Sequence, residues 1–318
     1  MSSLNAGQCI RVGKRTVVVE NLLGSGAFGT VYRVKDTRDQ VVFALKDVEC
    51  TENFQIETVV REINALVAAK HNHIVKIMGV DTYKPSRKTH FLILTEFCAG
   101  GDLNRRLDNE SNHDLNMKWV YQLADAVNFL HSRQPPIVHR DLKADNVFLA
   151  NPMTEDIKLG DLGLAREFPA AAQTDSIESY YMTSGVGPTH WMAPEFFTAH
   201  YNKKADIFSL GVLFYAIFAR HYQIFGKKKM YGVFVKIPNI SEENDIGLGL
   251  AMYLMKQELV PPFAPSFQAS NAMKSVIQDM LKFQPSERPP SDEIFERVRA
   301  MRSSFRLSRA QVHVRVQQ

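Results

Sequence analysis

Residues 139–146 read His-Arg-Asp-Leu-Lys-Ala-Asp-Asn, and this stretch decides how the rest of the 318-residue chain is interpreted. It follows a segment whose apolar residues recur every three or four positions, a spacing typical of a helix. It combines a carboxylate at Asp141, an ammonium group at Lys143 and an amide at Asn146. A carboxylate can accept a proton, and a neighbouring cation can stabilise charge in a transition state. A lone His-Arg-Asp is more often a surface turn, so the interpretation depends on motifs elsewhere.

A glycine-rich segment, Gly-Ser-Gly-Ala-Phe-Gly-Thr-Val, occupies residues 24–31. Glycines at Gly24, Gly26 and Gly29 let a backbone approach phosphate groups closely, because no side chain intervenes. In dinucleotide-binding folds a helix follows the last glycine, whereas β-forming residues follow it here. By itself the segment is also consistent with an ordinary hairpin turn.

Other charged residues follow in a definite order. Lys46 ends the strand after the glycine segment, and Glu62 lies on the helix predicted next. Asp161 opens an Asp-Leu-Gly triplet after a short strand, and Ala-Pro-Glu at 193–195 closes the loop beyond it. This order and spacing resemble eukaryotic protein kinases over residues 16–302. The resemblance implies a bilobal α+β fold, with a small β-rich N-lobe that has one key helix and a larger, mainly helical C-lobe.

The hydrophobic pattern agrees with two lobes. Strand-like runs separated by turns fill residues 17–98, and helical spacing dominates 99–302. We therefore expect an N-terminal extension at 1–16, a kinase domain at 17–302 and a fraying basic tail at 303–318. In the N-lobe helix the core-facing positions are expected to be Ile56, Val59, Val60, Ile63, Leu66 and Val67. The long connection at 226–265 is expected to hold its own helix at 248–256.

The resemblance implies transfer of the γ-phosphoryl group of ATP to Ser or Thr hydroxyls of proteins. This reaction requires mainly positioning and charge neutralisation. Lys46 is expected to bind the α- and β-phosphates, with Glu62 orienting it through an ion pair. Asp141 is expected to receive the proton of the substrate hydroxyl, and Lys143 to neutralise the transferring phosphate. Solvated surface charges are the plainer interpretation of Lys46 and Glu62 taken alone.

The same resemblance assigns the cofactor positions. Asn146 and Asp161 carry oxygen ligands suited to Mg²⁺. Thr95 stands where the gatekeeper of the family stands, and Asp102 where a ribose contact is common, although Asp102 could equally cap a helix. The full set of implied ATP-binding positions is Gly24, Gly26, Gly29, Val31, Ala44, Lys46, Thr95, Glu96, Cys98, Asp102 and Phe148.

Several motif residues are expected to hold the fold. Glu195 and Arg288 correspond to a buried ion pair, and Asp206 opens an apolar segment at 208–219 that reads as a buried core helix. That segment falls short of the ~20 residues of a membrane span. His139 is expected to support the loop around Asp141.

Some residues depart from the family pattern. Leu162 replaces the usual Phe, and Gly-Pro-Thr at 187–189 stands where many Ser/Thr kinases read Gly-Thr-Pro, which affects substrate docking. The phrase at 204–211, with the connection after it, is similar to the PDLIM-interacting kinase-like subgroup. That subgroup is associated with the nucleus and with actin-linked LIM proteins.

Control and substrate choice also follow from the resemblance. Thr183 and Ser184 are expected to accept an activating phosphate from an upstream kinase. Asp102 and Asp145 are expected to favour Arg or Lys just before the acceptor hydroxyl of the substrate. The alternative is that Asp102 binds ribose or caps a helix and that Asp145 is solvated.

Composition excludes several classes of protein. The chain is 45% hydrophobic and 23% charged, with a net charge of +4 and 3 cysteines. These values fit a globular protein without a disulfide scaffold or zinc cluster. No secretory signal is visible, so an intracellular protein, cytoplasmic or nuclear, with no membrane or nucleic-acid partner is expected. Two alternatives remain: a pseudokinase that binds nucleotide or partners without catalysis, and a nucleic-acid-binding protein that uses the basic tail.

Overall fold

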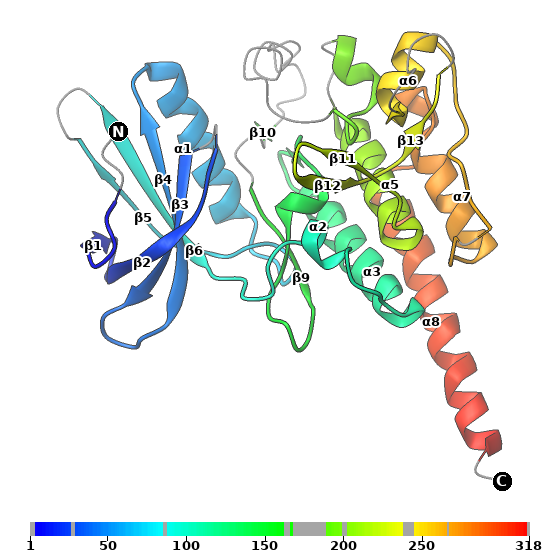
Figure 1. Ribbon diagram of the computed structural model, residues 1–318, viewed down its shortest axis with the longest axis horizontal. Helices are drawn as coiled ribbons and strands as arrows, with labels where there is room; N and C mark the ends of the chain where they lie inside the picture. The colour runs from blue at the N-terminus through cyan, green and yellow to red at the C-terminus, as the bar shows by residue number, and fades with distance from the viewer. Residues whose placement is uncertain are drawn as a thin grey trace.

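A computed structural model describes residues 4–26, 29–84, 88–161, 166–167, 189–198, 202–237, 245–265 and 267–316. A sheet with one helix forms one end of the molecule, and a helical region forms the other (Figure 1). The two-lobed α+β fold predicted from the sequence is therefore confirmed. No helix in the described ranges is long and apolar enough to cross a membrane.

The N-lobe is built on a 6-stranded antiparallel sheet in the order β1-β2-β3-β4-β6-β5. Its strands are β1 Cys9–Val12, β2 Arg15–Gly26, β3 Gly29–Asp36, β4 Val42–Cys50, β5 Ile77–Tyr83 and β6 Thr89–Glu96. Strand β1 pairs with β2 from Cys9 onward, so the sheet begins within the stretch predicted as an extension at 1–16.

Alternation along the strands divides the sheet into two apolar faces. One face carries a small core with Tyr32, Phe43 and Leu45. On the other face Ile93 belongs to the large core, which also takes in helix α1 (Asn53–Ala68) and the C-lobe. The two faces thus pack against different partners.

Helix α1 buries a narrower stripe than its sequence suggests. Val59 and Leu66 are buried, whereas Val60 and Val67 are 40% and 47% exposed. A helix packed against one surface buries only the residues that recur on one face, and Val60 and Val67 lie beside that stripe.

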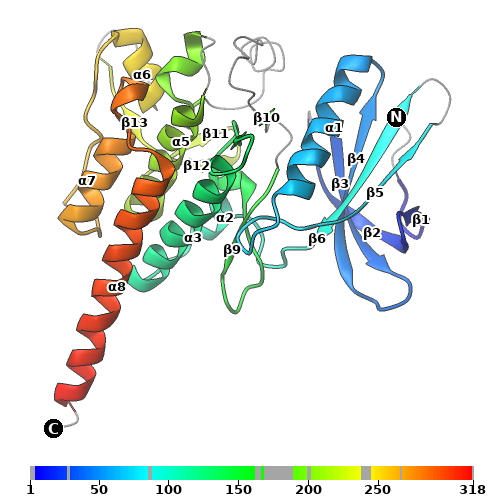
Figure 2. The ribbon, with the colours of Figure 1, turned by 180° about the vertical axis from the view of Figure 1, so that it is seen from behind.

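The C-lobe consists of helices packed around a buried central one (Figure 2). They are α2 Leu103–Arg106, α3 His113–His131, α5 Lys203–Ala219, α6 Leu248–Met255, α7 Asn271–Met280 and α8 Ser291–Val316. Residues 205–218 of α5 are all buried, which confirms the predicted core helix. Helix α6 confirms the helix expected in the long connection.

Helix α8 differs from the expectation for the C-terminus. The sequence predicts a fraying tail at 303–318, but α8 continues to Val316 and projects beyond the rest of the C-lobe (Figure 1). The stretch 291–316 contains no glycine or proline, and its Arg, Ala, Met and Gln residues favour helix.

Short two-stranded sheets and 3₁₀ turns complete the C-lobe. The sheets are β7 Ile137–Val138 with β10 Arg166–Glu167, β8 Val147–Leu149 with β9 Ile157–Leu159, β11 Tyr222–Phe225 with β12 Lys228–Tyr231, and β13 Phe234–Val235 with β14 Ile246–Gly247. The turns are η1 Ala144–Asn146, η3 Pro194–Thr198 and η4 Pro285–Glu287. The β11–β12 and β13–β14 sheets lie in or beside the connection at 226–265, where the sequence predicts only a helix.

Candidate active site

The Asp141 carboxylate is held from two sides within the loop between β7 and β8. Lys143 Nζ donates to Asp141 Oδ1 at 2.9 Å and to Oδ2 at 2.7 Å. Asn146 Nδ2 donates to the backbone carbonyl of Asp141 and to its Oδ2, each at 2.8 Å. These contacts fix the orientation of a carboxylate that is only 9% exposed.

Asp206, near the start of α5, forms hydrogen bonds to the backbone of this loop. Its carboxylate accepts from His131 Nε2 at 2.9 Å and from the backbone N–H groups of His139 at 2.7 Å and Arg140 at 2.9 Å. Burial alone would raise the pKa of Asp206, but the hydrogen bond and charge of His131 hold it below its ordinary value. A fully buried charge requires such partners, and here they clamp the backbone beside Asp141. Arg140 has a φ of 70°, a turn that this clamp stabilises.

His139 connects the same loop to the chain before Asp161. Its Nδ1 accepts from the Asp141 N–H at 3.3 Å, and its Nε2 donates to the Gly160 carbonyl at 3.1 Å. These partners require a neutral ring protonated on Nε2. The predicted supporting role of His139 is thereby confirmed, because the ring is fully buried and joins two functional segments.

Asp161 meets Lys46 across the two lobes. Lys46 Nζ donates to Asp161 Oδ1 at 3.2 Å. Burial would raise the pKa of Asp161, but the charge and hydrogen bond of Lys46 lower it below the ordinary value. The carboxylate is therefore ionised at neutral pH. Its backbone φ is 56°, a left-handed conformation that turns the chain after β9.

Register places the predicted nucleotide-binding residues of the N-lobe on one face of the sheet. Val31 on β3 pairs with Lys46 on β4, and Ala44 on β4 pairs with Thr95 on β6. Directly paired residues share a face, and so do residues two apart on one strand. All four side chains consequently lie on the face of Lys46, opposite the small core.

The glycine segment forms the end of the β2–β3 hairpin. Gly26 pairs with Gly29, and residues 27 and 28 lie outside the described residues. A Cβ at Gly29 would lie 2.4 Å from the Asp47 carbonyl oxygen, and its φ is 114°. Gly29 is therefore required by the fold, while a Cβ at Gly24 or Gly26 would meet no atom within 4 Å.

Phe148 and Gly160 pack together on the C-lobe side. A Cβ at Gly160 would lie 2.7 Å from Phe148 Cε2 and 3.0 Å from Val75 Cγ2. The absence of a side chain lets the backbone before Asp161 approach β8 closely. The Gly160 N–H also donates to the Asn146 carbonyl at 2.9 Å.

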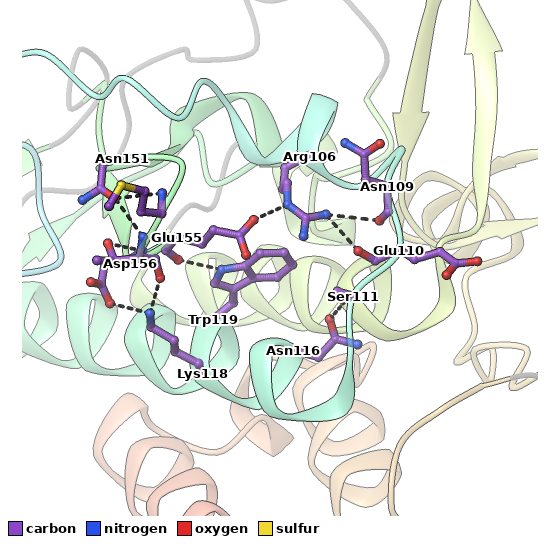
Figure 3. A network of polar contacts seen from close by, with 12 residues as sticks. Arg106, Asn109, Glu110, Ser111, Asn116, Lys118, Trp119, Asn151, Glu155 and Asp156 are labelled. Atoms are coloured by element: carbon purple, nitrogen blue, oxygen red, sulfur yellow. Dashed lines mark hydrogen bonds and ion pairs between the residues drawn. The ribbon is translucent and has the colours of Figure 1, made fainter.

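A polar network from α3 fixes the turn between β8 and β9 (Figure 3). Trp119 Nε1 donates to the Glu155 carbonyl at 2.9 Å, and Lys118 Nζ lies 2.8 Å from Asp156 Oδ1. Arg106 Nε pairs with the Glu155 side chain. Burial would raise the pKa of Asp156, but hydrogen bonds from Lys118 and Gln122 lower it to about 2. The strands on either side of this turn carry Phe148 and lead to Asp161.

Comparison with known sequences identifies the family. A protein-family model for the protein kinase domain matches residues 17–298. The chain belongs to this family. Serine/threonine-protein kinase WNK8 of Arabidopsis thaliana is 32% identical over 204 residues, which are 62% of this chain and 34% of that protein. A probable serine/threonine-protein kinase WNK10 of the same plant is 32% identical over 206 residues, which are 62% of this chain and 37% of that protein.

A third relative comes from rice. Probable serine/threonine-protein kinase WNK6 of Oryza sativa subsp. japonica is 34% identical over 200 residues, which are 60% of this chain and 42% of that protein. The aligned part thus spans between 34% and 42% of the length of these three relatives. The similarity to the PDLIM-interacting kinase-like subgroup stays a prediction.

In the segment that joins the lobes of this kinase domain, the Glu96 side chain contacts neighbouring parts of the protein. Glu96 Oε1 accepts from the Lys76 N–H at 2.8 Å and lies 2.9 Å from Lys158 Nζ. Burial, with a smaller effect of Glu96, raises the pKa of the Cys98 thiol to about 12, so that it stays protonated. Because the Glu96 side chain is engaged by Lys76 and Lys158, a contact of Glu96 with a nucleotide would use its backbone. Cys9, Cys50 and Cys98 are all free in the structure.

Asp102 caps a helix, the alternative that the sequence left open. Its Oδ1 accepts from the Arg105 N–H at 2.8 Å, and Arg105 Nε lies 3.5 Å from Oδ2. A ribose contact by the same carboxylate stays a prediction.

The predicted ion pair between Glu195 and Arg288 is confirmed. Arg288 Nη1 and Nη2 donate to Glu195 Oε1 and Oε2 at 2.6 and 2.8 Å. Arg288 is 1% exposed and also donates to the carbonyls of Lys204, Lys282 and Phe283. This bidentate pair fastens the end of the loop after Asp161 to the C-lobe.

Three predicted residues lie outside the described atoms. The backbone of Glu62 lies within α1, but its side chain is not described, so the ion pair with Lys46 stays a prediction. Thr183 and Ser184 lie outside the described residues, as do Leu162 and residues 187–188.

Sequence reasoning did not anticipate how Asp206 acts. It predicted a residue that holds the fold, whereas the carboxylate bonds directly to the backbone of the loop that carries Asp141. A charge at the start of an otherwise apolar helix was the available signal, because a buried carboxylate must find donors.

Proposed function

We propose that the protein is an active, ATP- and Mg²⁺-dependent protein kinase that phosphorylates Ser and Thr. The observation that carries this proposal is the Asp141 carboxylate, which Lys143 and Asn146 hold in one site with the Lys46–Asp161 pair. The family supports ATP as phosphoryl donor, and the printed names of the relatives support Ser and Thr as acceptors.

Asp141 acts as the group that receives the proton of the acceptor hydroxyl. Lys143 lies at both of its oxygens and can turn toward developing negative charge as the proton moves. Asn146 holds one of these oxygens, so the carboxylate keeps its direction throughout. The hydrogen bonds from Asp206 to the backbone fix this geometry before the reaction, which lowers the entropic cost of orienting Asp141 in the transition state.

The residues present fit ATP and Mg²⁺. Asp161 offers an ionised carboxylate, and Asn146, whose Nδ2 is used by Asp141, retains its Oδ1 for a cation. Carboxylate and amide oxygens are the ligands that Mg²⁺ prefers. Lys46 supplies a cation for phosphates, and the face with Val31, Ala44 and Thr95 supplies an apolar surface for a base. When bound, ATP with Mg²⁺ supplies the phosphoryl group and screens its charge.

No group of three or more His, Cys, Asp or Glu side chains in the described ranges could hold a metal ion. A magnesium ion that also contacts phosphate oxygens needs only one or two protein carboxylates. Asp161 would supply the carboxylate of such a site, and Asn146 an amide oxygen.

Proteins are the proposed substrates, and control by phosphorylation of Ser184 or Thr183 is a further part of the proposal. Both residues fall in the hydroxyl-rich segment between Asp161 and Glu195. Mass spectrometry of the active protein, with Ser184→Ala and Thr183→Ala variants, tests it. Unchanged activity in the double variant would exclude this form of control.

The direct test incubates purified protein with γ-labelled ATP, Mg²⁺ and a mixed protein substrate, followed by phosphoamino-acid analysis. We expect label on serine and threonine, and its loss in Asp141→Asn. Label on tyrosine alone, or equal labelling by the variant, would contradict the proposal.

A further inference from the structure

The hairpin β11–β12 follows the central helix α5 and has no equivalent among the predicted elements. Phe225 pairs with Lys228, so only Gly226 and Lys227 form the turn, and Gly226 has a φ of 62°. The hairpin lies beside α2 in both views (Figures 1 and 2). It exposes Tyr222, Ile224 and Phe225 by 40%, 65% and 38%, next to three consecutive lysines at 227–229.

The base of the hairpin is anchored to the helical lobe. Arg220, which ends α5 in a left-handed conformation, donates from Nη2 to Ser111 Oγ and, at 3.2 Å, to Asn116 Oδ1. Its guanidinium lies 5.7 Å from the centre of the Trp119 ring. Ser111 and Asn116 are joined to each other in the network of Figure 3. Burial, with a smaller effect of Arg106, lowers the pKa of Arg220 to about 10, so it remains charged at neutral pH.

The second strand is fixed to α2 and the residues after it. Asn104 Nδ2 donates to the Lys229 carbonyl at 2.8 Å. Asp108 accepts from Tyr231 Oη at 2.7 Å and from Lys229 Nζ at 2.9 Å. The hydrogen bonds from Tyr231 and then Lys229 lower the pKa of Asp108. The hairpin is thus held in a defined position.

The turn end of the hairpin reaches the loop that carries Asp141. Lys228 Nζ pairs with Asp145, which directly precedes Asn146. The Phe225 ring stacks on the His190 ring, with centroids 5.7 Å apart and planes 4° from parallel. His190 is buried, and after burial itself the charges of Lys143 and Lys228 contribute to lowering its pKa. Lys228 therefore lies in the electrostatic surroundings of the phosphotransfer residues.

The carboxylates expected to bind basic substrate residues are already engaged. Asp102 caps α2 beside Arg105, and Asp145 pairs with Lys228. In each pair the cation is the outer partner: Arg105 is 85% exposed against 21% for Asp102, and Lys228 51% against 18% for Asp145. Lys227 is exposed and forms no ion pair with a described residue. The rim beside the active site, formed by Arg105, Lys227 and Lys228, is therefore lined by cations on its outer side, and Asp102 and Asp145 neutralise two of them from behind.

We propose that the β11–β12 hairpin selects substrate segments with anionic side chains next to the acceptor Ser or Thr, with Lys227 and Lys228 as the recognising cations. The occupant is an acidic stretch of a protein substrate, carrying carboxylates or phosphorylated residues. This inference rests on the proposed kinase activity and reverses the basic preference predicted from Asp102 and Asp145. Charge complementarity carries it, because a cationic rim attracts anionic peptides and repels basic ones.

The test is a positional-scanning peptide library with the full chain, ATP and Mg²⁺, including Asp, Glu, phosphoserine, Arg and Pro at each position flanking the acceptor. We expect acidic residues to raise kcat/KM, and Lys227→Glu/Lys228→Glu to lower the ratio of kcat/KM for acidic peptides to kcat/KM for a neutral reference peptide by ~10-fold or more. Comparison of the Glu and phosphoserine arms identifies which anion is preferred.

Lys282→Glu is the matched control, because Lys282 also pairs with a carboxylate, that of Glu258, at 36% and 40% exposure. This variant should keep the acidic preference, and thermal unfolding should show that both variants fold. A basic or proline-directed preference, or an acidic one unchanged in the hairpin variant, would overturn the inference while leaving the proposed activity intact. Absence of transfer to every peptide and protein would overturn the proposed function itself.

Discussion

Asp161 and Lys46 carry the sharpest single-residue expectation. They lie 3.2 Å apart, and both are placed where phosphate and metal would bind. We predict that Asp161→Asn and Lys46→Met each lower phosphotransfer by ~100-fold or more, since each removes a charge that stabilises the transition state. Neither residue belongs to the apolar core, so thermal unfolding should shift by only a few degrees.

The measurement pairs initial rates with a melting curve for each variant. Either variant with near-normal turnover and an intact fold would contradict the role assigned to that residue.

His190 predicts a pH dependence of stability. Its ring is buried, burial lowers its pKa to about 3, and neither ring nitrogen has a hydrogen-bond partner among the described residues. The unfolded chain binds a proton near pH 6.5, whereas the folded protein does not. The free energy of unfolding therefore has its full value above pH 6.5 and falls as the pH decreases toward 3. The loss due to His190 is about 1 kcal/mol at pH 5.5.

His190→Phe should remove this part of the pH dependence, because a Phe ring can keep the stacking on Phe225. Urea unfolding of both proteins at pH 7.5 and 5.5 measures how much the free energy of unfolding changes between these pH values. His71 and His73 also have lowered pKa values, and the difference between wild type and variant cancels their contribution. Parallel curves for the two proteins would refute the assignment.

Single residues also mark what the sequence could predict about the site. Asp141, Lys143 and Asn146 were predictable because their spacing within one loop brings them together whatever the rest of the chain does. The bonds from Asp206 to that loop were not, because they join residues that are distant in the sequence and depend on how α5 packs. The ion pair between Lys228 and Asp145 was not predicted for the same reason, since the two residues are distant in the chain.

At the scale of elements, the Arg288–Glu195 pair joins the segment at 193–198 to the C-lobe. Removing one partner leaves the other charge buried, so Arg288→Ala should reduce the free energy of unfolding by ~3–5 kcal/mol. Arg299 pairs with Glu296, but these side chains are 57% and 53% exposed. Arg299→Ala should therefore cost less than ~1 kcal/mol.

Chemical denaturation of both variants gives the comparison. If both substitutions lowered the free energy of unfolding equally, burial would not determine how much the Arg288–Glu195 pair contributes to stability.

Elements differ in how far the sequence predicted them. Long periodic segments such as α3 and α5 were predicted well, because many apolar positions repeat the same signal. The hairpin β11–β12 was missed, since its strands are short and lysines occupy half of the second one. The extension of α8 to Val316 was missed because the apolar residues after position 303, such as Phe305, Leu307 and Val312, mostly lie two residues apart instead of three or four.

At the scale of the whole molecule, the active site exists only where both lobes meet. Lys46 belongs to the sheet, Asp161 and Asp141 belong to the helical lobe, and the large core is continuous from α1 to α7. Catalysis therefore depends on the two lobes being held together, and binding of nucleotide can in principle be separated from transfer. That separation distinguishes an active kinase from a pseudokinase.

The most direct test measures ATP affinity and phosphotransfer rate in the same preparations of wild type and Asp141→Asn. We predict that both proteins bind ATP with Mg²⁺ at Kd values within a few-fold of each other, and that only the wild type transfers phosphate, with the variant slower by ~100-fold or more. A wild-type protein that binds ATP but transfers nothing, or a variant that transfers at the wild-type rate, would contradict an active kinase built on Asp141.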